Sequence, residues 1–186
     1  FKGLSVISFE SRRAQQMVSL IERYGGSALS APTMREVAIE NNRDLLQFAD
    51  HLFDGQIDMV ILMTGVGTDM MAQAIETQHT QDRLARALNQ VVTVARGPKP
   101  VAALRQIGVN PTLTVNEPNT WQDVLDTVDH QGSLAGKQVA IQEYGVPNTQ
   151  LVKALEDRQA NVRRVAIYRW QLPQDLEPIR LAIRRI

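Results

Sequence analysis

Short runs of apolar and β-branched residues alternate along the chain with segments whose apolar residues recur every three or four positions. Residues 4–9 and 27–31 form the first two such runs. Between them, residues 11–24 carry apolar side chains at helical spacing, and Gly25-Gly26 follows, as is common where helices end. Strand, helix and strand in this order predict a βαβ unit, whose crossover connection makes the two strands parallel.

The same alternation continues between residues 44 and 168, where the pattern predicts five further strands separated by helices. The strands are expected at 58–63, 91–95, 112–115, 137–142 and 162–168. The helices are expected at 44–53, 68–76, 81–89, 98–107, 120–129 and 148–158, with a last helix from about residue 175. Thr120, with Asp123 three residues on, matches a capping box. This order is typical of a doubly wound α/β domain, a parallel sheet with helices on both faces.

The first βαβ unit does not fit into this five-stranded sheet, and it is too small to fold alone. We therefore assign residues 34–170 to a five-stranded α/β domain. Residues 1–33 and 171–186 are assigned to a second, discontinuous domain. The connecting segments, near 32–37 and 169–173, would form a paired hinge.

Composition and charge narrow the function. The chain has 186 residues, with 20 Lys and Arg against 20 Asp and Glu, so its net charge is zero. A general nucleic-acid binder needs a basic excess, so we expect no nucleic-acid contact by this segment. Cysteine is absent, which excludes disulfides, thiolate nucleophiles and cysteine-bound metals.

Targeting signals are not visible in the sequence. The longest apolar run, residues 59–63, is far shorter than the roughly 20 residues of a membrane span. No signal peptide is recognisable, so we expect a cytoplasmic protein without a membrane partner. The chain begins at Phe1 rather than Met and ends at Ile186 inside a helical pattern. We therefore expect truncation and an incomplete discontinuous domain.

Candidate ligand contacts lie in the loops after the strands, because open parallel sheets bind ligands at the carboxyl ends of their strands. Residues 64–68 read Thr-Gly-Val-Gly-Thr, and two glycines ahead of a helix allow backbone N–H groups to approach an anion. Residues 96–100 read Arg-Gly-Pro-Lys-Pro, and Lys99 at a helix start is unfavourable unless an anion compensates. A tight turn and a solvated basic loop are the respective alternatives.

Three further features suggest an anionic or flat ligand. Arg12 and Arg13 follow the first strand and oppose a helix dipole, with a solvent-facing pair as the alternative. Tyr144 could stack on a flat ligand or serve as a packing lid. Tyr168 and Trp170 could contact an aromatic anion or plug the domain boundary. From the residues alone we expect a polyanionic small molecule bound in an interdomain cleft.

Four longer motifs stand in a characteristic order. They read Val-Ile-Ser-Phe-Glu-Ser-Arg-Arg at 6–13, Arg-Gly-Pro-Lys-Pro at 96–100, Glu-Pro-Asn-Thr-Trp at 117–121 and Tyr-Arg-Trp-Gln-Leu-Pro at 168–173. In this order they resemble the uroporphyrinogen-III synthase family. The resemblance implies two flavodoxin-like, doubly wound parallel-sheet domains joined by a two-stranded linker, one domain being built from both chain ends. The family continues after the last motif with strands and helices that complete this domain, whereas the chain stops at Ile186.

The resemblance also implies an activity. Family members close the linear tetrapyrrole hydroxymethylbilane into uroporphyrinogen III, inverting the last pyrrole ring and losing water, in haem, chlorophyll and cobalamin biosynthesis. They are cofactor-free hydro-lyases that use no metal. We therefore expect a linear tetrapyrrole as the binding partner, a monomer, and a fragment that is inactive by itself. A non-catalytic tetrapyrrole- or anion-binding regulatory module is the alternative.

By the same resemblance, Tyr168 matches a tyrosine that assists departure of the substrate hydroxyl as a hydrogen-bond donor or acid. A phenol is protonated at neutral pH and can donate in this way. The resemblance places substrate contacts at Thr64, Gly65, Gly67, Thr68, Arg96 and Lys99, and we add Arg12, Arg13 and Tyr144 as candidate substrate contacts. For the two N-terminal arginines the correspondence is one of position.

Overall fold

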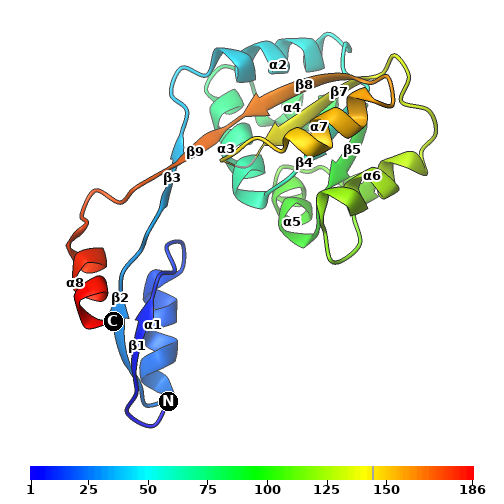
Figure 1. Cartoon of the computed structure of the whole chain (residues 1–186). Coiled ribbons are helices and arrows are strands. Elements are labelled where there is room, and N and C mark those ends of the chain that lie inside the picture. Colours follow the sequence, from blue (N-terminus) through cyan, green and yellow to red (C-terminus); the bar gives the residue numbers. More distant parts are fainter. Residues whose placement is uncertain (144) are drawn as a thin grey trace. The chain divides into compact units, whose positions relative to one another are not determined.

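The computed structural model describes residues 1–143 and 145–186, and the chain divides into two compact units (Figure 1). Unit 1 consists of Phe1–Val37 and Trp170–Ile186, and unit 2 consists of Ala38–Arg169. None of the helices within the described residues combines the length and the apolar composition that a bilayer crossing needs.

Unit 2 contains the predicted parallel sheet, whose five strands within the described residues lie in the order β6-β5-β4-β7-β8. The strands are β4 (Met59–Leu62), β5 (Val92–Ala95), β6 (Leu113–Thr114), β7 (Gln138–Glu143) and β8 (Asn161–Ala166). All four pairings are parallel, and β4 is hydrogen-bonded to β5 on one side and β7 on the other. The prediction of a parallel α/β sheet is therefore confirmed.

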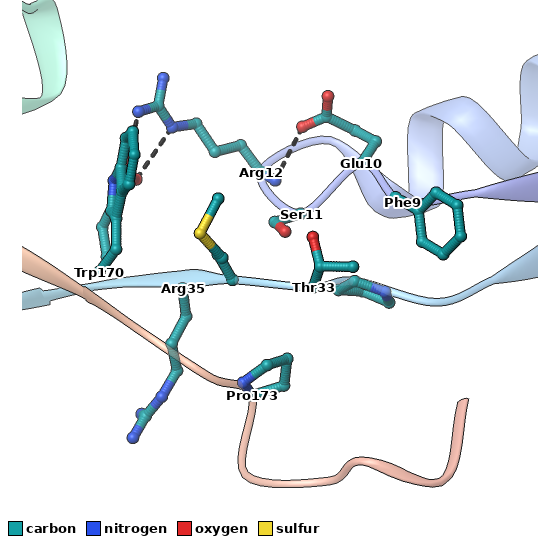
Figure 2. A pocket seen from close by; sticks show the side chains of 11 residues that line it. Phe9, Glu10, Ser11, Arg12, Thr33, Arg35, Trp170 and Pro173 are labelled. Carbon is teal, nitrogen blue, oxygen red and sulfur yellow. Dashed lines mark hydrogen bonds and ion pairs between the residues drawn. The ribbon is translucent and has the colours of Figure 1, made fainter. Parts of the chain in front are cut away.

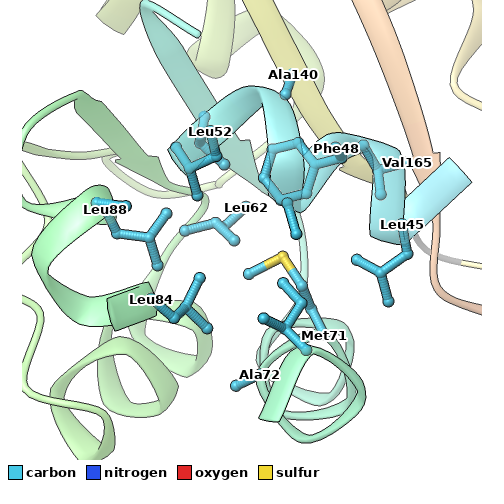
Figure 3. Packing of buried hydrophobic residues seen from close by; sticks show 14 of the residues in the cluster. Leu45, Phe48, Leu52, Leu62, Met71, Ala72, Leu84, Leu88, Ala140 and Val165 are labelled. Atoms are coloured by element: carbon cyan, nitrogen blue, oxygen red, sulfur yellow. The ribbon is translucent and has the colours of Figure 1, made fainter. Parts of the chain in front are cut away.

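Helices pack on both faces of this sheet, and β4 shows how the two faces are separated. They are α2 (Arg43–Phe53), α3 (Gly65–Glu76), α4 (Gln81–Leu88), α5 (Pro98–Gln106), α6 (Trp121–Asp129) and α7 (Thr149–Glu156). Val60 and Leu62 join a first core with α2, α3, α4 and α5 (Figure 3). Met59 and Ile61 join a second core with α6 and α7. Successive strand residues point to opposite faces, so every β4 side chain is buried.

Unit 1 contains the predicted βαβ unit. Strands β1 (Ser5–Ser8) and β2 (Ser27–Ser30) pair in parallel, and α1 (Ala14–Arg23) connects them. Helix α8 (Glu177–Arg185) buries Ala182. Most of the exposed large apolar side chains among the described residues belong to this unit: Phe1, Leu4, Phe9, Leu20, Tyr24, Met34, Trp170, Leu172, Ile183 and Ile186. A two-stranded sheet with two short helices does not cover its own apolar surface.

A further two-stranded sheet is formed by β3 (Arg35–Ala38) and β9 (Tyr168–Gln171). The sequence predicted a strand over residues 162–168 followed by a hinge, whereas the structure has β8 up to Ala166 and then β9 from Tyr168. The structure ends β8 at Ala166, because the next carbonyl, that of Ile167, already accepts the Ile39 N–H at 3.0 Å. The backbone thus leaves the five-stranded sheet and pairs with a different segment.

A carboxylate at the start of β4 gives this sheet a pH-dependent contact. Asp58 Oδ2 accepts the Gln138 N–H at 2.8 Å, and Asp58 Oδ1 accepts from Lys137 Nζ at 3.1 Å. The backbone bond from Gln138 is the larger cause that lowers the pKa of Asp58, and Lys137 adds to it.

We predict that Asp58→Ala lowers the free energy of unfolding by about 1 kcal/mol at pH 7, since the carboxylate is partly exposed. A carboxyl group whose pKa is lowered on folding stabilises above its unfolded pKa of about 3.9, and this stabilisation is lost as the pH falls below that value. Urea unfolding at pH 7 and pH 3 measures the difference. Asp54→Ala, at an exposed carboxylate beyond α2, is the control. An equal deficit at both pH values would contradict the prediction.

Candidate functional site

The carboxyl edge of the unit 2 sheet contains a topological switch point. The chain passes from β4 outward through β5 and β6, and then returns to place β7 on the opposite side of β4. Open α/β sheets bind ligands at the carboxyl ends of two strands that diverge in this way. The residues flanking this point are the turn after β4, Thr64–Gly67, and the last residues of β7, Gln142 and Glu143.

Helix α3 starts at the switch point, three residues earlier than the sequence predicted. Thr64 is its N-cap, because Thr64 Oγ1 accepts the Gly67 N–H at 3.1 Å. The Thr68 hydroxyl, 1% exposed as a residue, donates to the Thr64 carbonyl at 2.9 Å and is therefore occupied within the helix. The segment predicted as a ligand loop is thus the first turn of a helix.

The first turn of α3 offers backbone donors to an anion. The N–H groups of Gly65 and Val66 precede the first intrahelical bonds, and no acceptor for them occurs among the described residues. The helix dipole places partial positive charge at the same point. Gly65 lies close to the start of α5, since a Cβ atom there would be 2.8 Å from the Lys99 carbonyl oxygen. The predicted segments 64–68 and 96–100 therefore meet.

The first turn of α5 offers far fewer donors. Pro98 and Pro100 have no N–H, and Gly97 N–H already donates to the Ala95 carbonyl at 2.8 Å. The recognition elements left in this turn are the Lys99 N–H and the exposed Lys99 side chain. This helix start therefore contributes a mobile point charge rather than a cradle of amides.

Asn119 and Gln142 lie at this edge and were not predicted as site residues. Asn119 lies against Gly97, which has φ +88, because a Cβ atom on Gly97 would be 2.8 Å from Asn119 Oδ1. That oxygen is buried and has no hydrogen-bond partner among the described residues. Gln142 is 1% exposed, and its Oε1 accepts the Thr64 N–H at 3.2 Å. The signal in the sequence is slight: a polar residue that ends the apolar run of β7.

The other predicted residues of unit 2 lie in different surroundings. Arg96 is half-buried directly after β5, and its N–H donates to the Leu62 carbonyl at 3.0 Å. Tyr144 lies outside the described residues. Tyr168 is 2% exposed and belongs to the first core, together with Phe48. Its hydroxyl is buried and has no hydrogen-bond partner among the described residues.

Unit 1 contains a separate cavity of about 500 Å³ (Figure 2). Its lining comes from the loop after β1, from the segment around β3, and from the chain near β9: Phe9, Glu10, Ser11, Arg12, Pro32, Thr33, Met34, Arg35, Glu36, Trp170 and Pro173. Three of these side chains, Phe9, Met34 and Trp170, are large, apolar and exposed. The cavity therefore presents flat apolar surface beside charged groups. Of the two arginines predicted here, Arg12 lines the cavity and Arg13 does not.

Arg12 of this cavity is paired with a carboxylate of the chain itself, whereas the Arg35 guanidinium donates to the Leu172 carbonyl at 3.3 Å and to Gln171 Oε1 at 3.2 Å. The Arg12 guanidinium forms a bidentate ion pair with Glu36, in which Arg12 Nε donates to Glu36 Oε2 at 2.9 Å. Glu10 Oε1 accepts the backbone N–H groups of Arg12 and Arg13 at 2.9 and 3.1 Å. These bonds, that of Arg13 first, lower the pKa of Glu10. The anion that the sequence predicted at this helix start is thus supplied internally.

These two sites have different chemistry. The start of α3 provides backbone donors for a carboxylate, whereas the cavity of unit 1 provides apolar rings and carboxylate acceptors. Among residues 1–143 and 145–186, no three acidic or histidine side chains gather closely enough to hold a metal ion. The fold and the site together define a class: a parallel α/β protein with two helix starts next to its switch point.

The comparison with protein families narrows this class to one family. Residues 15–184 match the family model described as Uroporphyrinogen-III synthase HemD. The chain belongs to the uroporphyrinogen-III synthase family, as its motifs indicated.

Solved structures of two uroporphyrinogen III synthase crystals are similar to this chain, and the chain covers only part of each relative. A mutant uroporphyrinogen III synthase from the extremely thermophilic bacterium Thermus thermophilus is 25% identical, with a TM-score of 0.73 over 98% of this chain and 69% of that one. A wild-type crystal form from the same organism is 27% identical, with a TM-score of 0.62 over 97% and 67%. The uncharacterized protein YjjA of Bacillus subtilis (strain 168) is 26% identical over 168 residues. Those residues make up 89% of this chain and 60% of YjjA, so the chain spans less than two thirds of that relative.

We predict that Gly67→Ala destabilises unit 2 by about 1–3 kcal/mol, because its new methyl group would overlap two fixed side chains. A Cβ atom at this position would lie 2.6 Å from Gln142 Cδ and 2.8 Å from Thr64 Oγ1. Urea unfolding monitored by circular dichroism gives the change. At an open helical position the same substitution would stabilise by roughly 1 kcal/mol, so a gain in stability would contradict the close packing.

Proposed function

We propose that the protein is a uroporphyrinogen-III synthase, which converts hydroxymethylbilane into uroporphyrinogen III. The observation that carries this proposal is the match of residues 15–184 to the family model. The reaction removes the terminal hydroxyl of the linear substrate as water, and a carbon–carbon bond then closes the ring. The last pyrrole is inverted through a spiro intermediate. Because the overall change is loss of water and rearrangement, no oxidant or reductant is consumed.

The chemistry of the substrate fits the donors on the protein. A polycarboxylate needs many hydrogen-bond donors, and free N–H groups at a helix start provide them without a basic excess. The N–H groups of Gly65 and Val66, together with the Lys99 side chain, support this role in a chain of zero net charge. The principal work of such a site is to hold a flexible chain in a cyclisable shape, which is an entropic contribution.

The finer architecture follows from the same proposal. The five-stranded unit 2 corresponds to the domain assigned to residues 34–170, and unit 1 to the discontinuous domain of residues 1–33 and 171–186. Strands β3 and β9 correspond to the family's two-stranded linker. A cytoplasmic location and a monomeric state remain predictions.

A product assay tests the proposed function. The natural gene product that contains this chain is supplied with enzymatically generated hydroxymethylbilane, and the products are oxidised and separated as type I and type III isomers. Formation of the type III isomer supports the synthase. Tight binding of a tetrapyrrole with type I product alone would instead identify a non-catalytic tetrapyrrole-binding module, and absence of both would overturn the proposal.

We predict that Lys99→Ala weakens binding of an octacarboxyl porphyrin by about 1–3 kcal/mol, because a charge-assisted contact to a carboxylate is lost. Isothermal titration calorimetry measures the dissociation constant. Lys153→Ala, at an exposed lysine on α7, is the matched control and should leave binding unchanged. Equal affinities of the Lys99 variant and the wild type would remove this side chain from the site.

We predict that Tyr168→Phe lowers turnover by about 10²–10⁴-fold, the usual value of general acid assistance, while the fold is retained. The support is a phenolic hydroxyl that is buried and lacks an acceptor among the described residues, so a departing substrate hydroxyl could accept from it. Initial rates of type III product formation measure the effect, with Tyr24→Phe at an exposed tyrosine as the control. A decrease smaller than about tenfold would assign Tyr168 to packing in the first core.

A further inference from the structure

We propose that Gln142 is a positioning residue for the proposed reaction. In this inference, which rests on the proposed function, Gln142 holds the first turn of α3 so that the N–H groups of Gly65 and Val66 can receive a substrate carboxylate. Gln142 does not touch the substrate, and it acts through Thr64. The structure supports this role through burial, hydrogen bonding and close packing at one end of β7.

The burial of Gln142 makes its hydrogen bonds obligatory. Gln142 is 1% exposed near the end of β7, an internal strand of the sheet. A buried amide costs free energy unless both its oxygen and its nitrogen are bonded. Gln142 Oε1 accepts the Thr64 N–H at 3.2 Å, and Gln142 Nε2 donates to the Glu143 carbonyl. The side chain therefore links the end of β7 to the turn after β4, across the switch point.

The group that Gln142 holds is the cap of α3. Thr64 uses its N–H for Gln142 and its hydroxyl oxygen for the Gly67 N–H. The orientation of Thr64 thus fixes where the helix begins and which N–H groups remain for a ligand. Among the described residues, the N–H groups without an acceptor belong to Gly65 and Val66, the two residues that follow.

Close packing adds a second restraint on the same turn. A Cβ atom at Gly67 would lie 2.6 Å from Gln142 Cδ, so the amide group of Gln142 rests directly against the backbone of α3. The turn is therefore held by a hydrogen bond at Thr64 and by contact at Gly67. Two restraints from one rigid side chain leave little freedom to rotate the free N–H groups.

Glu143, whose carbonyl accepts from Gln142, is itself held by an ion pair. Glu143, 6% exposed, accepts from Arg164 Nε at 2.8 Å and from Arg164 Nη2 at 3.3 Å. The side-chain bond to Glu143 raises the pKa of Arg164. This ion pair ties β7 to β8 and steadies the Glu143 carbonyl to which Gln142 donates. A continuous series of contacts thus runs from β8 to the start of α3.

A purely structural role is the competing explanation, and affinity separates the two. If Gln142 served folding alone, its replacement would lower stability while the folded protein bound its ligand normally. If it positions the N–H groups, the folded variant binds a carboxylate ligand more weakly. The ligand affinity and KM would then change more than kcat, because the anchored carboxylate lies away from the reacting atoms.

The test compares Gln142→Met with Gln138→Met in the natural gene product that contains this chain. Methionine keeps the length of the side chain and removes both hydrogen bonds, and Gln138 is an exposed glutamine at the opposite end of the same strand. The measurements are the dissociation constant of octacarboxyl porphyrin by calorimetry, KM and kcat for hydroxymethylbilane, and hydrogen exchange of the Thr64 amide. All are made well below the melting temperature, after circular dichroism has confirmed folding.

We expect Gln142→Met to raise the dissociation constant and KM about tenfold or more, with kcat changed less than about threefold and faster exchange at Thr64. Gln138→Met should match the wild type. If Gln142→Met does not fold, Gln142→Glu replaces it, because its carboxylate retains an acceptor for the Thr64 N–H. That carboxylate also competes for the same donors, so at least the same loss of affinity is expected.

Each other outcome overturns a defined part of this proposal. A dissociation constant and KM within about twofold of the wild type would show that Gln142 acts in folding alone. Weaker porphyrin binding by the variant, in a protein that forms no type III product, would overturn the proposed function, while still showing that Gln142 positions a carboxylate-binding turn. A wild-type protein that neither binds the porphyrin nor turns over the linear substrate would refute the positioning role as well.

Discussion

Burial of β4 on both faces is the constraint on which the rest of unit 2 depends. Its four side chains divide between two cores, so no position on the strand is available for chemistry. Polar function is therefore confined to the point where the strand ends and α3 begins. There the backbone changes direction, and its N–H groups are no longer used by the sheet. The same burial restrains this end of the strand through close packing.

The two units differ in whether the donors at a helix start are bonded to carboxylates of the chain. In unit 2 the N–H groups of Gly65 and Val66 have no acceptor within residues 1–143 and 145–186. In unit 1, Glu36 and Glu10 accept from Arg12 and from the start of α1. A helix start is therefore not an anion site merely because its sequence is basic. What decides is whether the chain places its own carboxylate there, and in unit 1 it does so twice.

The sequence predicted those features that depend on local pattern. The five strands of unit 2, the βαβ unit and the Thr120–Asp123 capping box follow from periodicity and spacing, and the structure confirms them. Helix α3 was predicted to start too late, because glycine at 65 and 67 is typical of loops. It is helical here because Thr64 caps it. Glycine stands at both positions because the neighbouring atoms leave no room for a Cβ atom.

Features that join distant parts of the chain could not be predicted from the sequence. Gln142 and Thr64 are 78 positions apart, and Arg12 and Glu36 are 24 apart. Neither pair has a local signal, since the partner of each side chain is set by the sheet order and the loop path. The break between β8 and β9 has the same origin, because it depends on where another segment lies.

Because of the two prolines at the start of α5, this helix start and that of α3 would attract an anion over different distances. With few N–H groups in that turn, α5 acts on an anion mainly through the exposed Lys99 ammonium group. Such a charge attracts over a Debye length, about 8 Å at physiological ionic strength, and added salt weakens it. The backbone donors of α3 act at hydrogen-bond distance and depend far less on salt. In the proposed function, capture of a charged substrate and its final orientation would thus fall to adjacent helices and would respond separately to ionic strength.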